Sequence, residues 1–286
     1  MKRVVPLLCL ACVAGIAATG YSMLGTGAAD AIAVPAAAPA PAVATSTAAA
    51  ALRAARRQCS LPPLDAVIDD LRARTAAAAD DAEGWHLLAE ALLERVQQRA
   101  HLRGMAVGTP VFAELPAELA RDLDDGLAAV AKARALGDDG GDLYRLEAGL
   151  MGQHITGLGS ALRWNARIET ALAAAGERLQ DDPQLHTLLG LRKLLAPRLL
   201  GHDPQRALEH FEFAARVLAD DERPAVFAAM ASYLQQKRMQ AVAWLEQAVA
   251  RNPKNTFARV VLQRVRRDEP EPFGRDVTAE EIAAVK

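Results

Sequence analysis

The side chains that could carry chemistry do not form a known catalytic pattern. No Gly-x-Ser-x-Gly motif, which would present a serine nucleophile, occurs in the sequence. The segment nearest to it in composition, residues 157–160, is expected to be a turn between helices. His202 and His210 are eight residues apart, but Gly201 and Pro204 oppose the continuous helix that would align them as metal ligands. The sequence therefore predicts no catalytic, cofactor or metal site.

Acidic residues are numerous, but they are spread over nearly every predicted helix. The runs at residues 122–125 and 220–222 fall where helices are expected to begin, and carboxylates there interact favourably with the helix macrodipole. The glycines between residues 149 and 159 follow no predicted strand, which a phosphate-binding loop would require. Capping and close helix packing therefore explain these residues, and binding is the class of function that remains.

The composition favours helices and argues against a nucleic-acid partner. The 286 residues include 33 Lys or Arg and 35 Asp or Glu, so the net charge of -2 provides no basic surface for phosphates. The large apolar fraction, 51%, comes mostly from Ala and Leu, which lose little side-chain freedom in a helix. We expect an all-α protein.

The start of the chain has the pattern of an export signal or a membrane anchor. Basic residues at positions 2 and 3 precede an uncharged segment that extends to residue 29. A cleaved signal peptide and a retained anchor both fit residues 1–29, and a lipoprotein attached through Cys12 is a weaker alternative. Either form places the rest of the chain in the periplasm, free or anchored to the inner membrane.

An Ala/Pro-rich stretch follows and is expected to be a tether over residues 30–59. Its three prolines, Pro35, Pro39 and Pro41, oppose a helix and extend the chain. Cys59 is the one cysteine beyond the apolar segment, so an internal disulfide framework is excluded there. We expect an exposed thiol at the end of the tether, either incidental or paired with another molecule.

Beyond Pro63, apolar residues recur every three or four positions, which is the helical period. Leu64, Ile68 and Leu71 show this spacing, and no segment alternates convincingly with the period of a strand. Several breaks contain Asp followed by Pro, a pairing typical of a helix N-cap and first turn. The breaks divide the chain into helices and lie at residues 104–110, 137–141, 181–183, 201–204, 220–224 and 252–253.

The strongest internal pattern is a small-large-small triplet that recurs after 34 residues. A small residue allows close helix approach, and the large residue between two small ones fills the space between hairpins. This period is that of the tetratricopeptide helical hairpin. The two copies are Ala207, Phe211, Ala214 and Ala241, Leu245, Ala248.

Three segments resemble the tetratricopeptide-repeat family: residues 82–89, 203–211 and 239–253. The resemblance implies an α/α solenoid of helical hairpins over residues 60–267, followed by a tail over residues 268–286 with a short helix from Thr278. Residues 103–123 depart from the repeat pattern, so we expect an irregular middle. Residues 80–85 are also similar to periplasmic tetratricopeptide subunits of cytochrome c maturation. Residues 194–211 resemble the T component of tripartite periplasmic transporters.

The resemblance also implies a non-enzymatic scaffold that binds a peptide or protein partner in a helix-lined groove. In such solenoids the first helix of each hairpin lines the concave surface. Trp85 is expected to point into the core instead. One alternative is an accessory small-molecule-binding protein of a transport system, and another is an enzyme on a helical scaffold. For the hairpin that begins near residue 82, the expected partner-binding residues are Glu83, His86, Glu90 and Leu93.

Overall fold

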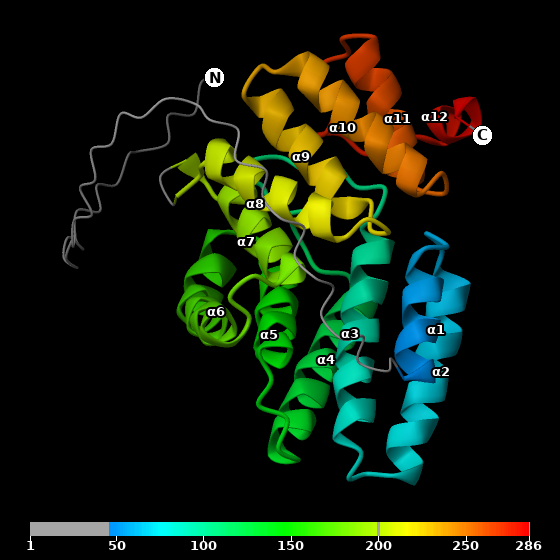
Figure 1. Cartoon of the computed structure of the whole chain (residues 1–286), viewed down its shortest axis with the longest axis vertical. Coiled ribbons are helices and arrows are strands. Elements are labelled where there is room, and N and C mark those ends of the chain that lie inside the picture. The colour runs from blue at the N-terminus through cyan, green and yellow to red at the C-terminus, as the bar shows by residue number, and fades with distance from the viewer. Residues whose placement is uncertain (1–45, 199–200, 286) are drawn as a thin grey trace, which may run out of the picture. The chain divides into compact units, whose positions relative to one another are not determined.

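The computed structural model describes residues 46–198 and 201–285 (Figure 1). The predicted signal or anchor segment and most of the predicted tether lie outside these residues. The described part contains helices and one isolated bridge between Ala106 and Thr109, but no β-strand. Its helices are α1 (Thr47–Arg56), α2 (Leu61–Ala77), α3 (Ala82–Arg99), α4 (Ala117–Ala135), α5 (Gly141–Gln153), α6 (Leu158–Arg178), α7 (Pro183–Leu195), α8 (Pro204–Val217), α9 (Arg223–Leu234), α10 (Arg238–Arg251), α11 (Thr256–Arg266) and α12 (Ala279–Ala284).

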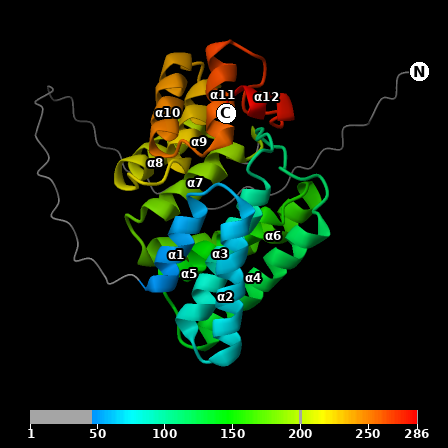
Figure 2. The same cartoon turned by 90° about the vertical axis from the view of Figure 1, so that its right-hand side faces the viewer.

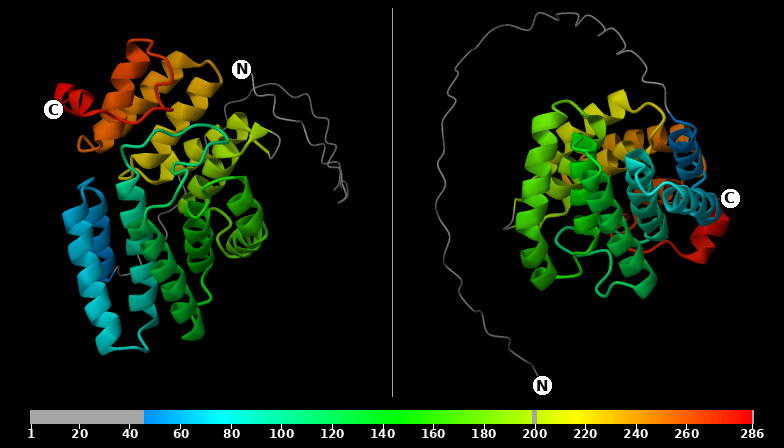
Figure 3. Two further views of the ribbon diagram at one scale, coloured as in Figure 1. Left: turned by 180° about the vertical axis from the view of Figure 1, so that it is seen from behind. Right: turned by 90° about the horizontal axis from the view of Figure 1, so that it is seen from below.

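Consecutive helices pack as hairpins, so the predicted fold class, an all-α tetratricopeptide-like solenoid, is confirmed. The closest pairs are α3 with α4, α5 with α6, α7 with α8, and α9 with α10. The first helices of these hairpins also contact one another, α3 with α5, α5 with α7 and α7 with α9 (Figures 2 and 3). The predicted irregularity lies between α3 and α4, where residues 100–116 form a long connection without a helix.

Each predicted break falls between two helices, and two of the Asp-Pro pairs begin helices as expected. The carboxylate of Asp182 accepts a hydrogen bond from the Leu185 amide at 2.8 Å, and that of Asp203 accepts from the Arg206 amide at 3.0 Å. The capping role predicted for Asp122 is wrong. This residue lies inside α4 with 4% of its surface exposed, because it forms an ion pair with Arg95.

The repeated triplets form the core of the C-terminal hairpins. All six residues are fully buried, and the helices that carry them, α8 and α10, both pack against α9. The Phe211 ring fits a space that Gly190 leaves open on α7, since a Cβ at Gly190 would lie 2.5 Å from a ring carbon. α10 ends at Arg251, before Asn252 and Pro253, as the repeat pattern predicts.

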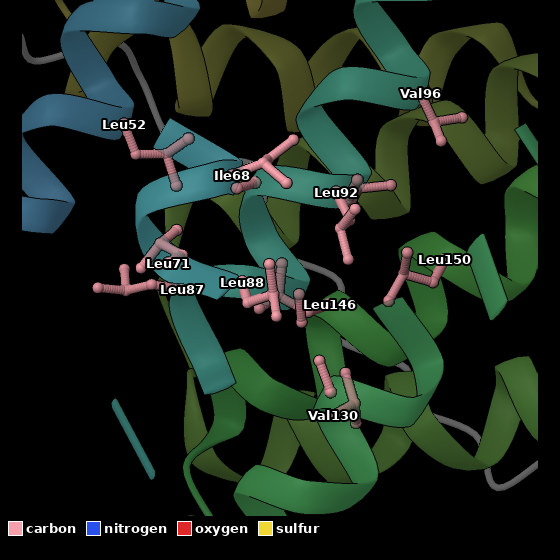
Figure 4. Packing of buried hydrophobic residues seen from close by; sticks show 14 of the residues in the cluster. Leu52, Ile68, Leu71, Leu87, Leu88, Leu92, Val96, Val130, Leu146 and Leu150 are labelled. Atoms are coloured by element: carbon pink, nitrogen blue, oxygen red, sulfur yellow. The ribbon is translucent and has the colours of Figure 1, made fainter. Parts of the chain in front are cut away.

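The folded unit begins earlier than expected, because α1 lies within the predicted tether. Leu52 and Ala55 of α1 are buried, and Leu52 joins a core that includes Ile68 and Leu92 (Figure 4). The expectation of an exposed Cys59 thiol is also wrong, because Cys59 is half-buried and its Sγ accepts a hydrogen bond from Asn252 at 3.3 Å. Burial, with the nearby Glu222 carboxylate, raises the pKa of this thiol to about 12.

The C-terminal tail folds back onto the last hairpin around one buried arginine. Arg264 is 1% exposed and donates to the carbonyl groups of Pro272, Arg275 and Asp276 at 2.9–3.0 Å. The predicted short helix is confirmed as α12, which Thr278 caps.

Within residues 46–198 and 201–285, none of the helices combines the length and apolar character needed to cross a membrane.

Candidate functional site

A cavity of about 230 Å³ lies where the first helices of the hairpins converge. Side chains from α3, α5, α7, α9 and α11 line it, so its walls come from the inner side of the solenoid. The walls combine apolar side chains with a similar number of charged or polar ones. The apolar walls include Leu93, Leu146, Leu188, Leu191, Val226 and Phe227.

The connection between α3 and α4 covers part of this cavity, and residues 100–111 are called the covering segment below. Three backbone hydrogen bonds tie it to the C-terminal half. The Met105 amide donates to the Phe273 carbonyl at 2.7 Å, and the Gly108 amide donates to the Leu195 carbonyl at 2.9 Å. In the opposite direction, the Val277 amide donates to the Leu102 carbonyl at 2.9 Å. The covering segment therefore makes the concave side a partly enclosed site instead of an open groove.

A second long-range contact joins the first hairpin to the last ones. The Arg57 guanidinium donates to the carbonyl of Arg251 at 3.3 Å, and the Asn252 amide group donates to the Arg57 carbonyl at the same distance. These contacts connect the turn between α1 and α2 with the turn between α10 and α11. Both ends of the described solenoid are therefore fixed relative to the cavity.

One group of charges at the cavity is fully paired. The Arg223 guanidinium donates to Glu94 at 2.9 Å, to Asp221 at 3.0 Å and to the Gln97 amide oxygen at 2.9 Å. Burial alone would lower the pKa of Arg223, but Asp221 and Glu94 outweigh burial and hold it well above its usual value. This network satisfies its own members and serves to join α3 to α9.

Two other charged side chains at the cavity are satisfied only in part or not at all. Arg145 of α5 is 12% exposed in its side chain, and its Nε donates to Asp142 at 2.6 Å. Within the described residues, its two Nη atoms have no hydrogen-bond partner, and the Glu90 carboxylate has no hydrogen-bond or ion-pair partner. Burial raises the pKa of Glu90, while the Arg145 charge acts in the opposite direction. The two side chains affect each other electrostatically but are not within 4.0 Å.

Three neutral polar side chains add to these free groups. The Nε2 atom of His101, on the covering segment, is buried and has no partner in the part of the chain that the structure describes. Burial lowers the pKa of His101 to about 4, so its ring is neutral near pH 7. Gln153 and Gln184 line the cavity, and neither side-chain amide has a hydrogen-bond partner among the described residues. The cavity therefore offers donors and acceptors that the protein itself does not use.

The structure places two of the four predicted partner-binding residues at the cavity. Glu90 and Leu93 line it. Glu83 is exposed and pairs with Arg74 of α2 at 2.8 Å, whereas the His86 ring lies between Asp138 at 2.7 Å and Asp142 at 2.9 Å. Of the four predicted residues, only the two nearer the C-terminal end of α3 therefore reach the cavity, and binding by these residues stays a prediction.

Sequence reasoning missed Arg145, His101 and Gln184. Arg145 stands between Tyr144 and Leu146 in a helix without a recognised repeat motif, and His101 lies just before the segment that departs from the repeat pattern. Their contribution depends on contacts between elements far apart in the chain.

The described residues contain no cluster of three or more His, Cys, Asp or Glu side chains arranged to hold a metal ion.

Comparison with known proteins adds little to this description. No family model matches the chain, and no curated protein matches it. Among solved structures, the chain is similar to YrrB, described as a TPR protein with an unusual peptide-binding site. The two chains are 13% identical with a TM-score of 0.36, over 71% of this chain and 86% of YrrB.

Proposed function

We propose that this protein is a non-enzymatic binding scaffold of the cell envelope that holds a peptide or protein segment at the cavity on its concave side. The observation that supports this proposal is the set of cavity groups without hydrogen-bond partners: the Glu90 carboxyl group, the two Nη atoms of Arg145 and the buried Nε2 atom of His101. Buried polar groups in native proteins are nearly always hydrogen-bonded, because an unsatisfied one costs free energy. A ligand that pairs with these groups recovers that cost. The Arg223 guanidinium, in contrast, is already hydrogen-bonded to Glu94, Gln97 and Asp221.

The size of the cavity limits what enters it. At about 30 Å³ for each water-sized group, 230 Å³ accommodates roughly eight non-hydrogen atoms. That is about the size of one amino-acid residue. A bound segment would therefore insert a single residue, while its neighbours lie along the helices outside.

Site-specific photo-crosslinking tests this proposal. A photoreactive residue is placed at Gln184, which lines the cavity, and as a control at Gln247, which is exposed on α10. We expect one protein to be captured from intact cells at Gln184 and not at Gln247. The substitution Leu188→Trp, which fills the cavity, should abolish capture at Gln184. Equal capture at both positions, or capture that Leu188→Trp does not change, would contradict the proposal.

A second candidate function is the binding of a small molecule. The observation that favours it is the covering segment, which is hydrogen-bonded to α7 and to the C-terminal tail and so encloses the cavity. Small-molecule sites are typically concave and mostly apolar, with a few polar groups that fix orientation. In this case extraction of the purified protein would yield one bound metabolite, identified by mass spectrometry, and Leu188→Trp would remove it.

The envelope location rests on the sequence pattern of residues 1–29, which lie outside the described residues. Cell fractionation with N-terminal sequencing tests it. A mature protein that starts after residue 29 in the periplasm indicates a cleaved signal, and an intact start in the membrane indicates an anchor. Recovery of the intact chain from the cytoplasm would contradict the envelope location.

A further inference from the structure

A carboxyl group and a guanidinium group face the same cavity from adjacent inner helices and do not pair with each other. Glu90 lies on α3 and Arg145 on α5. Asp142 holds the Nε edge of the Arg145 guanidinium at 2.6 Å, and the His86 Nε2 lies 2.9 Å from the other oxygen of the same carboxylate. This chain of contacts fixes the guanidinium and leaves its two Nη atoms free at the cavity.

A ligand that fits this arrangement supplies a cation to Glu90 and hydrogen-bond acceptors to the two Nη atoms of Arg145, whose charge is already paired with Asp142. An internal peptide residue offers only an amide and a carbonyl, so Glu90 would stay without a counter-charge and the Nη atoms would meet only a neutral acceptor. A terminal residue of a peptide supplies only one of the two charged partners. A free amino acid supplies both, because its ammonium group pairs with a carboxylate and its carboxylate accepts two parallel hydrogen bonds from a guanidinium.

We propose that the cavity binds a free α-amino acid with an apolar side chain, its ammonium group on Glu90 and its carboxylate on the Nη atoms of Arg145. The side chain of the ligand would lie against Leu188, Leu191 and Phe227. The volume agrees, since roughly eight non-hydrogen atoms is about the size of a mid-sized amino acid. This inference rests on the second of the two proposed functions, because it specifies the small molecule for the same cavity.

Calorimetric titration of the full-length chain in mild detergent tests this inference. The probes are L-valine, L-leucine and L-methionine, each compared with its N-acetyl and its amide derivative. The acetyl group removes the ammonium charge, and the amide removes the carboxylate charge. We expect at least one free amino acid to bind about tenfold or more tightly than both of its blocked forms, because the N-acetyl form offers no cation to Glu90 and the amide form offers only a neutral acceptor to the Nη atoms of Arg145. Blocked forms that bind equally well, or no binding by any free amino acid up to about 1 mM, overturn the inference.

A matched pair of variants assigns the ammonium contact. Glu90→Gln keeps the shape of the side chain and removes its charge. It should eliminate the preference for the free amino acid over its N-acetyl form. Glu177→Gln makes the same change at an exposed position on α6 and should leave the preference intact. Melting curves establish that both variants fold. A folded Glu90→Gln variant that retains the preference overturns the inference.

The two failures are distinguishable. If no free amino acid binds but Gln184 captures a protein and Leu188→Trp prevents that capture, the inference fails while the peptide or protein scaffold stands. If neither experiment detects an occupant of the cavity, both the inference and the proposed function fail.

Discussion

The C-terminal hairpins and the inner helices α3 and α5 solve the same packing problem with different chemistry. Between α7 and α10 the core is built from alanines and large apolar residues such as Phe211 and Leu245. Around α3 and α5, charged residues occupy positions close to the core. Arg95 pairs with Asp122, and Arg145 pairs with Asp142. Apolar packing gives a pattern that repeats along the sequence, whereas ion pairs between helices do not.

This difference separates a region of regular packing from the proposed binding region. In the C-terminal hairpins Phe211 and Leu245 are fully buried in the core, and the same hairpins supply part of the apolar cavity wall. At α3 and α5, the polar groups of Glu90 and Arg145 are left available at the cavity. We infer that the regular hairpins support the less regular ones, where the ligand chemistry lies. The four predictions below test this division, beginning with the largest expected effect.

Replacement of Phe211 by Ala should have the largest effect on stability. The ring is fully buried and lies 5.5 Å from the Phe227 ring, centroid to centroid. A cavity of this size costs about 3 to 5 kcal/mol in the free energy of unfolding. Urea titration measures the loss. The control is Phe211→Leu, which introduces the residue found at Leu245 in the next hairpin and should cost less than half as much. Equal costs for both variants would contradict the repeat-core interpretation.

Replacement of Asp122 by Asn tests the buried ion pair between α4 and α3. Asp122 accepts a hydrogen bond from the Arg95 Nε at 2.9 Å, and a second carboxylate, Asp65, lies 3.1 Å from the same guanidinium. Loss of one partner of a buried pair destabilises strongly, and because Asp65 remains we expect about 2 to 3 kcal/mol. Asp125→Asn, in the same helix but exposed in its pair with Arg72, should cost about 0.5 kcal/mol or less. A similar loss in both variants would show that Asp122 has no special role.

The same division explains how much could be predicted from the sequence. The helices, their breaks and the 34-residue repeat follow from local periodicity, caps such as Asp182 and Asp203, and apolar residues whose burial depends on near neighbours. The covering segment and the pairing of Arg95 with Asp122 depend on contacts between distant elements. Of the four predicted binding residues on α3, only Glu90 and Leu93 line the cavity. Residue spacing predicts which residues share one face of a helix. It does not predict which part of that face lies at the cavity, because this depends on distant elements such as the covering segment.

The stability of the α3–α5 contact should decrease at alkaline pH because of His86. Burial alone would lower the pKa of His86, but hydrogen bonds to Asp142 and Asp138 outweigh it and raise the pKa from 6.5 to about 9. A raised pKa in the folded state means that the contribution is complete below pH 6.5 and is lost as the pH rises through 9. We expect a loss on the order of 2 kcal/mol between these limits. Thermal unfolding at several pH values, compared between the native chain and His86→Gln, measures it. A difference between the two proteins that is the same at pH 6 and pH 10 would contradict this assignment.

Trp85→Ala should have the smallest effect of the four, although the sequence predicts a core position for this residue. The indole is only partly buried at the edge of the N-terminal core, and its Nε1 donates to the Ala79 carbonyl at 3.1 Å. A fully buried tryptophan would cost about 3 to 5 kcal/mol when truncated, but this one exposes part of its surface in the folded state, so we expect about 1 to 2 kcal/mol. Leu88→Ala, one turn further along α3 and 5% exposed, should cost more than Trp85→Ala in the same urea titration. A larger cost for Trp85→Ala would mean that the core along α3 is centred nearer to the N-terminus of this helix than the described packing indicates. It would contradict the division of α3 into core residues and cavity residues.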